Sequence, residues 1–215
     1  YNINIYGTRN VVQACLELGV QKLVHTSSIA AIGYEPDGRK ATETTQFNWQ
    51  PFDIGYRTSK FFSEQEVFRG IRLGLPAVIV NPSVVIGPRD LRFRGGRIIR
   101  DIYKKRIFYH TSGGMNVVYI DDVIRGHIAA AENGRIGERY ILCGENFTFK
   151  EMFTTTAGIV GGIAPLFKLP TAGVKVVAAA AETASRLVNL RPWVSRDLVA
   201  GMEIQNWFSC GKAER

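Results

Sequence analysis

Residues 56–81 read YRTSKFFSEQEVFRGIRLGLPAVIVN, in which an amphipathic stretch is followed by an unbroken apolar run. The amphipathic pattern predicts a helix over residues 56–73, and Gly74 and Pro76 then end it because neither residue continues a helix well. The apolar run at 77–81 is short and uninterrupted, which is typical of a strand buried on both faces of a parallel sheet. This stretch therefore predicts one helix–strand unit of an α/β fold.

The residues before this stretch also predict helices that alternate with strands. The run QKLVHTSS at 21–28 predicts another buried strand, and a polar loop at 34–55 leads from it into the helix at 56–73. An earlier helix is predicted to end at Gly19, with an apolar stripe made of Ile5, Val11, Val12, Cys15, Leu16 and Leu18. Because strands and helices alternate, we expect an α/β fold with an open, doubly wound parallel sheet.

The pattern changes after residue 90, where the elements become shorter and less regular. The predicted elements there are helices at about 96–105, 121–133 and 174–188 and strands at 117–120 and 137–144. We expect residues 1–90 to form part of the sheet domain. Residues 91–215 are predicted to form mainly a smaller, mixed and mostly helical lobe, with some segments returning to the sheet.

The composition of the chain narrows the classes of function. Its 215 residues are 46% hydrophobic and 21% charged, as in a soluble globular protein. The net charge is +8, and much of the excess lies in a basic run at 89–106. No aromatic platform for base stacking accompanies that run, so we expect no nucleic-acid partner. No apolar run is long enough to span a bilayer, so we expect no integral membrane segment.

Cysteine and histidine usage argues against a metal site. The three cysteines and three histidines are scattered without metal-ligand spacing, so we expect no metal and a reduced, cytoplasmic compartment. The first residue is Tyr1, not methionine, and it stands inside a helical pattern. We therefore interpret the sequence as a piece of a longer chain whose targeting signals are not shown.

Tyr56 and Lys60 stand four residues apart at the head of a predicted helix, which places both side chains on one helical face. A nearby ammonium group favours the phenolate and lowers the pKa of a tyrosine, so the two residues are either a tuned acid/base pair or two ordinary helix residues. Ser27 and Ser28 follow one predicted strand, and the segment NPSVVIGP (81–88) follows the next. Ligands bind at the carboxyl ends of such strands, so all of these groups converge on one sheet edge.

Four stretches together identify a resemblance to a known family. In chain order they are VVQACLELGVQKLVHTSSIAAIG (11–33), YRTSK (56–60), NPSVVIGP (81–88) and NVVYIDDV (116–123). Their order and spacing resemble an extended short-chain dehydrogenase/reductase over about residues 2–144. The resemblance implies a Rossmann-like fold, of which this chain holds the C-terminal portion. It also implies an NAD(P)-dependent oxidoreductase.

The resemblance assigns catalytic roles to particular residues. Tyr56 matches the tyrosine that acts as general acid when a ketone is reduced and as general base in reverse. Lys60 matches its partner, which lowers the pKa of the phenol and reaches the nicotinamide ribose. Ser28 matches the serine that polarises the carbonyl, with Ser27 as the neighbouring alternative. Asn4 matches the asparagine of the family's proton relay.

The cofactor site implied by the resemblance is incomplete in this sequence. The matching positions are Tyr56, Lys60, Ser27, Pro82 and Ser83. The family opens with a strand and a glycine-rich turn that holds the pyrophosphate, and the sequence contains no such turn. The residue that separates NAD from NADP is missing as well. We expect NAD or NADP, with NADP preferred.

The substrate is predicted from the turn HTSGGMN (110–116), which lacks the arginine that sugar-nucleotide epimerases carry there. It is similar to the turn of dihydroflavonol-reductase-like and 3β-hydroxysteroid-dehydrogenase-like members, so we expect a ketone or secondary alcohol on a moderately apolar substrate. A nucleotide-sugar epimerase or dehydratase, with Arg92 or Arg97 at the phosphates, is one alternative. A non-catalytic cofactor-binding or scaffold protein is another. Members of the family often pair through the helix that carries Tyr56, so a homodimer is a further expectation.

Overall fold

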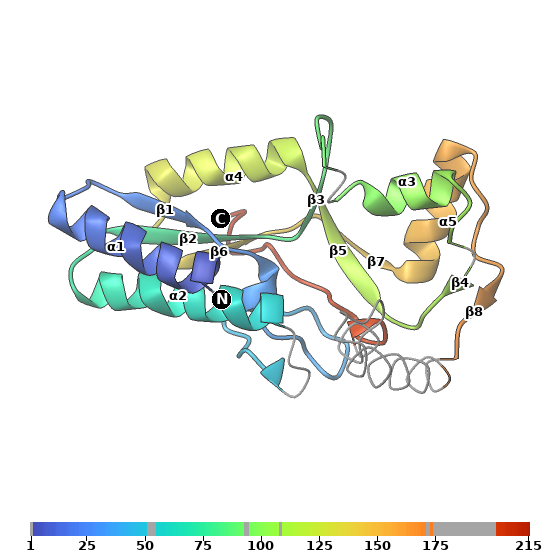
Figure 1. The fold of residues 1–215 in the computed structure, drawn as a ribbon, viewed down its shortest axis with the longest axis horizontal. Coiled ribbons are helices and arrows are strands. Elements are labelled where there is room, and N and C mark those ends of the chain that lie inside the picture. Colours follow the sequence, from blue (N-terminus) through green and yellow to red (C-terminus); the bar gives the residue numbers. More distant parts are fainter. Residues whose placement is uncertain (1, 51–54, 93–94, 108, 171–172, 174–200) are drawn as a thin grey trace, which may run out of the picture. The chain divides into compact units, whose positions relative to one another are not determined.

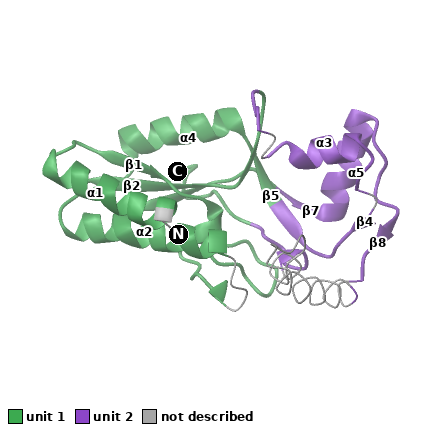
Figure 2. Ribbon diagram, viewed as in Figure 1, with its two compact units in different colours: residues 1–88, 116–145, 208–215 green, residues 89–115, 146–207 purple. Residues whose placement is uncertain are grey.

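The computed structural model describes residues 2–50, 55–92, 95–107, 109–170, 173 and 201–215. The helix predicted at 174–188, and Arg94 of the basic run, lie outside the described residues. The chain divides into two compact units, coloured separately in Figure 2. Unit 1 comprises residues 1–88, 116–145 and 208–215, and unit 2 comprises residues 89–115 and 146–207. Every residue of the predicted site belongs to unit 1.

Unit 1 is built on a parallel three-stranded sheet with the order β1-β2-β6. Its strands are β1 (Leu23–Thr26), β2 (Ala77–Pro82) and β6 (Arg139–Leu142). Thr26 pairs with Val80, and Pro82 pairs with Leu142. Because the strands are parallel, their carboxyl ends meet at one edge of the sheet. The predicted α/β fold with a parallel sheet is confirmed.

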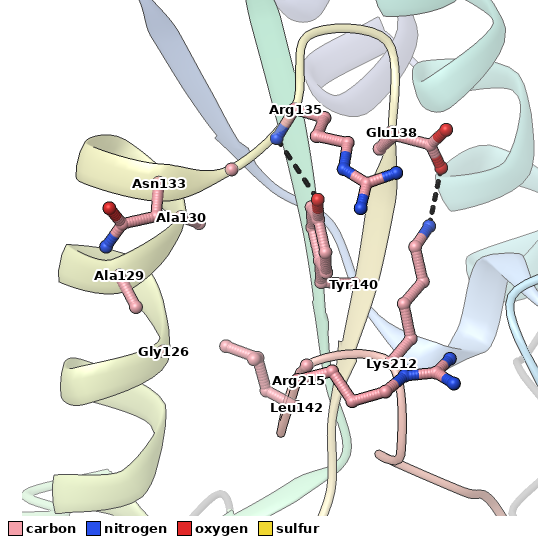
Figure 3. Close-up of a pocket in the computed structure, with 12 residues that line it drawn as sticks. Gly126, Ala129, Ala130, Asn133, Arg135, Glu138, Tyr140, Leu142, Lys212 and Arg215 are labelled. Carbon is pink, nitrogen blue, oxygen red and sulfur yellow. Dashed lines mark hydrogen bonds and ion pairs between the residues drawn. The ribbon is translucent and has the colours of Figure 1, made fainter.

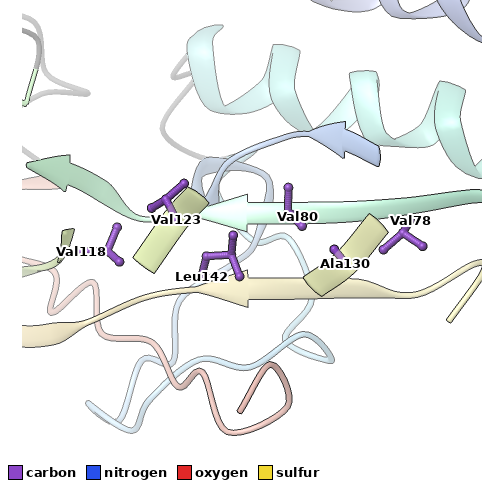
Figure 4. Close-up of a cluster of buried hydrophobic side chains, with 6 residues drawn as sticks. All are labelled: Val78, Val80, Val118, Val123, Ala130 and Leu142. Atoms are coloured by element: carbon purple, nitrogen blue, oxygen red, sulfur yellow. The ribbon is translucent and has the colours of Figure 1, made fainter. Parts of the chain in front are cut away.

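Helices cover both faces of this sheet, as Figure 1 shows. The helices α1 (Gly7–Glu17) and α2 (Gly55–Arg72) lie on one face, and α4 (Ile120–Asn133) lies on the other. Strand β2 serves both cores, because alternate side chains of a strand point to opposite faces. Ala77 and Ile79 pack with Val12, Val67 and Leu75, whereas Val78 and Val80 pack with Val118, Val123, Ala130 and Leu142 (Figure 4). This two-sided burial explains why the strand sequence is continuously apolar.

The first helix differs from its predicted pattern. A π-helical turn, η1 (Asn2–Tyr6), precedes α1, and Gly19 ends the segment with φ +61°, as predicted for a C-terminal glycine. Of the predicted apolar stripe, Val12 is fully buried, but Val11 and Leu18 are 51% and 80% exposed. The stripe was therefore wrong at these two positions. Helical spacing gives the candidates for burial, and the contact with α2 decides which of them are covered.

Smaller elements complete the two units. Strand β3 (Val84–Ile86) pairs in parallel with β5 (Gly114–Tyr119), and β7 (Glu145–Thr148) belongs to the same sheet. In unit 2, α3 (Arg97–Tyr103) contacts α5 (Phe149–Val160), and β4 (Tyr109–His110) pairs with β8 (Phe167–Lys168). A capping box formed by Thr148 and Glu151 begins α5. No helix within the described ranges is long and apolar enough to cross a membrane.

The packing of α1 on α2 depends on Gly70. A Cβ atom added there would lie 2.5 Å from Cγ1 of the buried Val12 and 3.1 Å from Cδ2 of Leu75. We expect Gly70→Val to lower the free energy of unfolding by about 2 kcal/mol or more, because a full core cannot absorb the extra volume. Gly158 of α5 has open space around it, so Gly158→Val is the matched control and should not destabilise the protein. Urea unfolding measures both, and equal losses would contradict the packing account.

Candidate functional site

The head of α2 carries the predicted acid/base pair. Tyr56 is 57% exposed, which leaves its ring accessible to a ligand. One turn later, Lys60 donates from Nζ to the backbone carbonyl of Thr26 at 3.3 Å, at the carboxyl end of β1. Burial lowers the pKa of Lys60, while the charge of Glu64 acts in the opposite direction. The ammonium group is thus held where α2 meets the sheet edge.

The serines at the two strand ends are positioned by the sheet itself. Ser27 follows β1, and its backbone amide donates to Val80 O at 2.8 Å. Ser83 follows Pro82, the last residue of β2, and its backbone amide donates to Leu142 O at 3.0 Å. Both serines are buried. The structure therefore brings Ser27, Pro82 and Ser83 to the same edge of the sheet.

Ser28 has a structural role in addition to the predicted chemical one. Its Oγ accepts a hydrogen bond from Ala30 N at 3.2 Å and caps the short 3-10 helix η2 (Ile29–Ala31). The helices η2 and α2 are in contact, which places Ser28 beside the helix that carries Tyr56. Because the cap uses a lone pair of Oγ, the hydroxyl hydrogen is not consumed by it.

Asn4 reaches the site through one intermediate side chain. Its Nδ2 donates to Ser59 Oγ at 2.9 Å, and Ser59 Oγ in turn donates to the backbone carbonyl of Tyr56 at 2.8 Å. Asn4 therefore supports the first turn of α2 from the π-helical turn before α1. The sequence placed Asn4 in a proton relay, and the structure shows its link to the backbone of Tyr56.

Several buried polar atoms at the sheet edge have no hydrogen-bond partner among the described residues. They include Ser27 Oγ, Asn81 Oδ1 and Ser83 Oγ. An unpaired buried polar atom costs roughly 1–3 kcal/mol, and a polar ligand at this edge would supply the partners that these atoms lack. Hydroxyl groups and an amide oxygen at the ends of neighbouring strands match the donors and acceptors of a carboxamide. The residues present fit the nicotinamide end of a dinucleotide.

The pyrophosphate end of a dinucleotide has no counterpart in this sequence. No two glycines stand two residues apart anywhere in it, so it contains no glycine-rich turn of the dinucleotide-binding kind. The residues that fit the cofactor are thus restricted to the edge formed by β1, β2 and α2.

Sequence reasoning missed three buried polar groups that lie behind the site, namely Glu64, Asn81 and Arg139. Glu64 and Asn81 are fully buried, and the side chain of Arg139 is mostly buried, with 18% of it exposed. The sequence itself contains a signal for two of these residues, Glu64 and Asn81. Glu64 follows Lys60 by one helical turn, on the same face, and Asn81 is the polar end of an otherwise apolar strand.

A cavity lies elsewhere in unit 1 and holds none of the predicted site residues. It measures about 750 Å³ and is bounded by α4, β6 and residues 212–215 (Figure 3). On its wall, Tyr140 accepts from Arg135 N at 3.1 Å, and Lys212 pairs with Glu138 at 2.6 Å. The unpaired polar atoms point to the sheet edge and not to this cavity.

His25 lies in β1, where its Nε2 is 3.4 Å from Ser63 Oγ of α2. Burial and the nearby charge of Lys60 lower the pKa of His25 to about 4. An unfolded histidine binds a proton near pH 6.5, so between pH 6.5 and 4 the unfolded state takes up more protons than the folded state. The contribution of His25 to the free energy of unfolding is therefore complete above pH 6.5, and it is lost as the pH falls from 6.5 to 4.

We expect the free energy of unfolding to fall by about 1.4 kcal/mol for each pH unit between 6.5 and 4 because of this one group. Urea unfolding at pH 7 and at pH 5 measures the loss. The His25→Gln variant should show a shallower dependence, since glutamine does not titrate. An unchanged slope in the variant would show that His25 is not the group responsible.

Known proteins resemble this chain in sequence and in structure. The sterol demethylase protein B of Methylococcus capsulatus is 32% identical over 173 residues, which cover 79% of this chain and 52% of that protein. The crystal structure of gox2253 is 41% identical with a TM-score of 0.84 and covers 98% of this chain and 64% of that one. A nucleoside-diphosphate-sugar epimerase from Pseudomonas aeruginosa, PA4631, is 25% identical with a TM-score of 0.80, over 98% of this chain and 66% of that one.

The chain spans about half the length of the curated relatives it matches. Its structural relatives confirm the Rossmann-like fold of the extended short-chain dehydrogenase/reductases. The sequence model of one protein family matches residues 1–151. These residues include the sheet of unit 1, the Tyr56–Lys60 pair and the serines at the strand ends. On this match, the chain belongs to the 3-beta hydroxysteroid dehydrogenase/isomerase family.

Proposed function

We propose that the protein is an NAD(P)-dependent oxidoreductase that interconverts a ketone and a secondary alcohol on a moderately apolar substrate. The observation that carries this proposal is the position of Lys60. Its ammonium group is anchored on Thr26 O at the carboxyl end of β1, one helical turn from the exposed Tyr56. In the proposal, Tyr56 is the general acid or base, and Lys60 is the cation fixed one helical turn away from it.

In this proposal the side chains of the chain handle the proton and orient the substrate. Tyr56 gives a proton to the carbonyl oxygen of a ketone or takes one from an alcohol in the reverse direction. Ser28, or Ser27 beside it, donates a hydrogen bond to the same oxygen. Asn4, acting through Ser59, keeps the turn that carries Tyr56 in place. The nicotinamide cofactor, when bound, supplies or accepts the hydride.

The cofactor is proposed to lie along the ends of β1 and β2. Pro82 and Ser83 would line the nicotinamide ring, with the unpaired hydroxyl groups of Ser27 and Ser83 available to a carboxamide. This sequence holds no residue matched to the choice between NAD and NADP, and NADP is the cofactor that we propose to test first.

The substrate class is proposed from the relatives and from the turn at 110–116. The family takes its description from a hydroxysteroid dehydrogenase, and one relative is named a sterol demethylase protein. In the structure only residues 111–113 of the stretch 110–116 lie between β4 and β5. The stretch HTSGGMN is uncharged apart from its histidine and suits an apolar ring system better than a diphosphate. A ketone or secondary alcohol on fused rings is therefore the substrate class to screen.

We expect Tyr56→Phe to reduce turnover of the full-length protein roughly 100-fold or more, because the variant lacks the acidic hydroxyl. The affinity for the cofactor, measured by fluorescence titration, should change little. Tyr140→Phe is the matched control, since that hydroxyl only accepts from Arg135 N, and its turnover should stay within about twofold. Turnover that survives in Tyr56→Phe would contradict the assignment.

A nucleotide-sugar epimerase is the second candidate, favoured by the similarity to PA4631. Arg97, one of the two arginines proposed as phosphate ligands, pairs with Asp101 at 3.4 Å. Arg100 pairs with the same carboxylate at 3.4 Å. Equilibrium dialysis with UDP- and dTDP-sugars, run beside a panel of ring ketones with NADPH, separates the two candidates. We expect turnover of a ring ketone and no saturable binding of a sugar nucleotide. The reverse result would establish the epimerase reading.

The third reading, a cofactor-binding scaffold without catalysis, predicts binding of NADPH with no turnover of any ketone or sugar nucleotide. The arrangement of Tyr56, Lys60 and Ser28 argues against it, because a scaffold has no need of a proton donor. A homodimer through α1 and α2 remains part of the proposal. Phe62 of α2 is 46% exposed and is available to such a contact, whereas Phe61 stacks on Phe47 at 4.4 Å.

A further inference from the structure

Glu64 carries a carboxylate that is fully buried, with 0% of its surface exposed. It lies in α2, two helical turns after Tyr56 and one turn after Lys60, so the three side chains follow one face of the helix. A buried charge is strongly unfavourable unless it is paired and hydrogen-bonded. The partners of Glu64 therefore show what the charge is retained for.

One carboxylate oxygen of Glu64 is paired with an arginine on the sheet. Arg139 Nη1, in β6, lies 3.2 Å from Glu64 Oε2. The same guanidinium donates from Nε and Nη2 to the backbone carbonyl of Glu43, at 2.9 and 2.6 Å. The positive charge is consequently fixed in place, and it balances the charge of Glu64 without using the other carboxylate oxygen.

The other oxygen of Glu64 accepts a hydrogen bond from Asn81, the fifth residue of β2. Asn81 Nδ2 lies 2.5 Å from Glu64 Oε1 and 2.9 Å from the backbone carbonyl of Ser28. The two hydrogens of the amide thus connect Glu64 to the serine segment after β1. The amide cannot be reversed, because Asn81 Oδ1 would then face two acceptors.

We propose that Glu64 is a positioning residue that fixes the Ser27–Ser28 segment relative to Tyr56 and Lys60 through Asn81. This inference rests on the proposed function, because it concerns the geometry of that reaction. The serine segment belongs to the sheet edge, whereas the tyrosine and lysine belong to α2. The carboxylate of Glu64 belongs to α2 and is linked to the serine segment through Asn81, so it sets the distance between the helix and the segment. Errors of about 1 Å in such distances lower the rate of catalysis strongly.

The same arrangement orients the unpaired oxygen of Asn81. With both amide hydrogens engaged, Oδ1 is directed away from Glu64 and Ser28 and remains buried without a partner among the described residues. Glu64 thereby controls both the carbonyl of Ser28 and the orientation of an acceptor at the cofactor edge.

The test uses three single variants of the full-length protein and the double variant Glu64→Gln/Asn81→Ala. Glu64→Gln removes the charge and retains the shape, and Asn81→Ala removes the link to Ser28 while leaving the pair of Glu64 with Arg139. Glu66→Gln is the matched control, because Glu66 lies on the same helix and pairs with Arg9 at 2.6 Å and Arg69 at 3.0 Å at the protein surface. The activity and hydrogen exchange of every variant are measured at a temperature at which circular dichroism shows that variant to be fully folded.

Two readouts are recorded, namely turnover and amide hydrogen exchange of the segment 27–32. We expect Glu64→Gln and Asn81→Ala each to lower kcat about 10- to 100-fold with little change in the KM of the ketone, and to accelerate exchange in that segment. The double variant should be little worse than either single one, since both break the same link. Glu66→Gln should leave kcat and exchange unchanged.

The exchange measurement keeps this inference separate from the proposed function. If the wild type reduces no ketone but Glu64→Gln still accelerates exchange at 27–32, the positioning role stands and the proposed reaction is wrong. If the exchange of this segment is the same in Glu64→Gln and in the wild type, the positioning role is overturned, whatever the activity. An effect of Glu64→Gln that Asn81→Ala does not reproduce would overturn the route through Asn81.

Discussion

The carboxylate of Glu64, which has no access to solvent, reaches from the middle of α2 to Arg139 of β6 and Asn81 of β2. Helix α2 also carries Tyr56 and Lys60, so this contact fixes the chemical groups of the helix against the strands. Breaking a buried pair leaves an uncompensated charge, and typical losses are about 3–5 kcal/mol. In the account proposed above, this pairing holds α2, β2, β6 and the serine segment in register.

Near that pairing, the edge of the sheet contains buried polar groups that lower the stability of unit 1, whereas its core clusters are apolar. Apolar side chains form one core cluster on each side of β2, around Val78 and Val80 on one side and around Ala77 and Ile79 on the other. At the edge, in contrast, Ser27 and Ser83 are buried with unpaired hydroxyl groups, and Lys60 loses hydration. Local rules of folding are expected to be violated at functional sites, and three of these unpaired atoms belong to Ser27, Asn81 and Ser83 at the ends of β1 and β2.

The fold and the site were predictable from sequence to different degrees. Helix α2 and strands β1 and β2 follow from short-range patterns, because apolar spacing and the break at Gly74 and Pro76 are local signals. The burial of Glu64 is not local, since its partners stand 17 and 75 residues away along the chain. For the same reason the stripe of the first helix predicted the burial of Val12 correctly but not that of Leu18, because tertiary contacts decide which side of a helix is covered.

The central claim is that Tyr56, Lys60 and the strand-end serines serve a hydride transfer to a carbonyl carbon. The most direct test follows the hydride itself, with the full-length protein, a ring ketone and a nicotinamide cofactor deuterated at the position that donates it. The account predicts that the product alcohol carries deuterium on its carbinol carbon, as mass spectrometry would show. A product without the label, or a tightly bound cofactor that is never consumed, would contradict it.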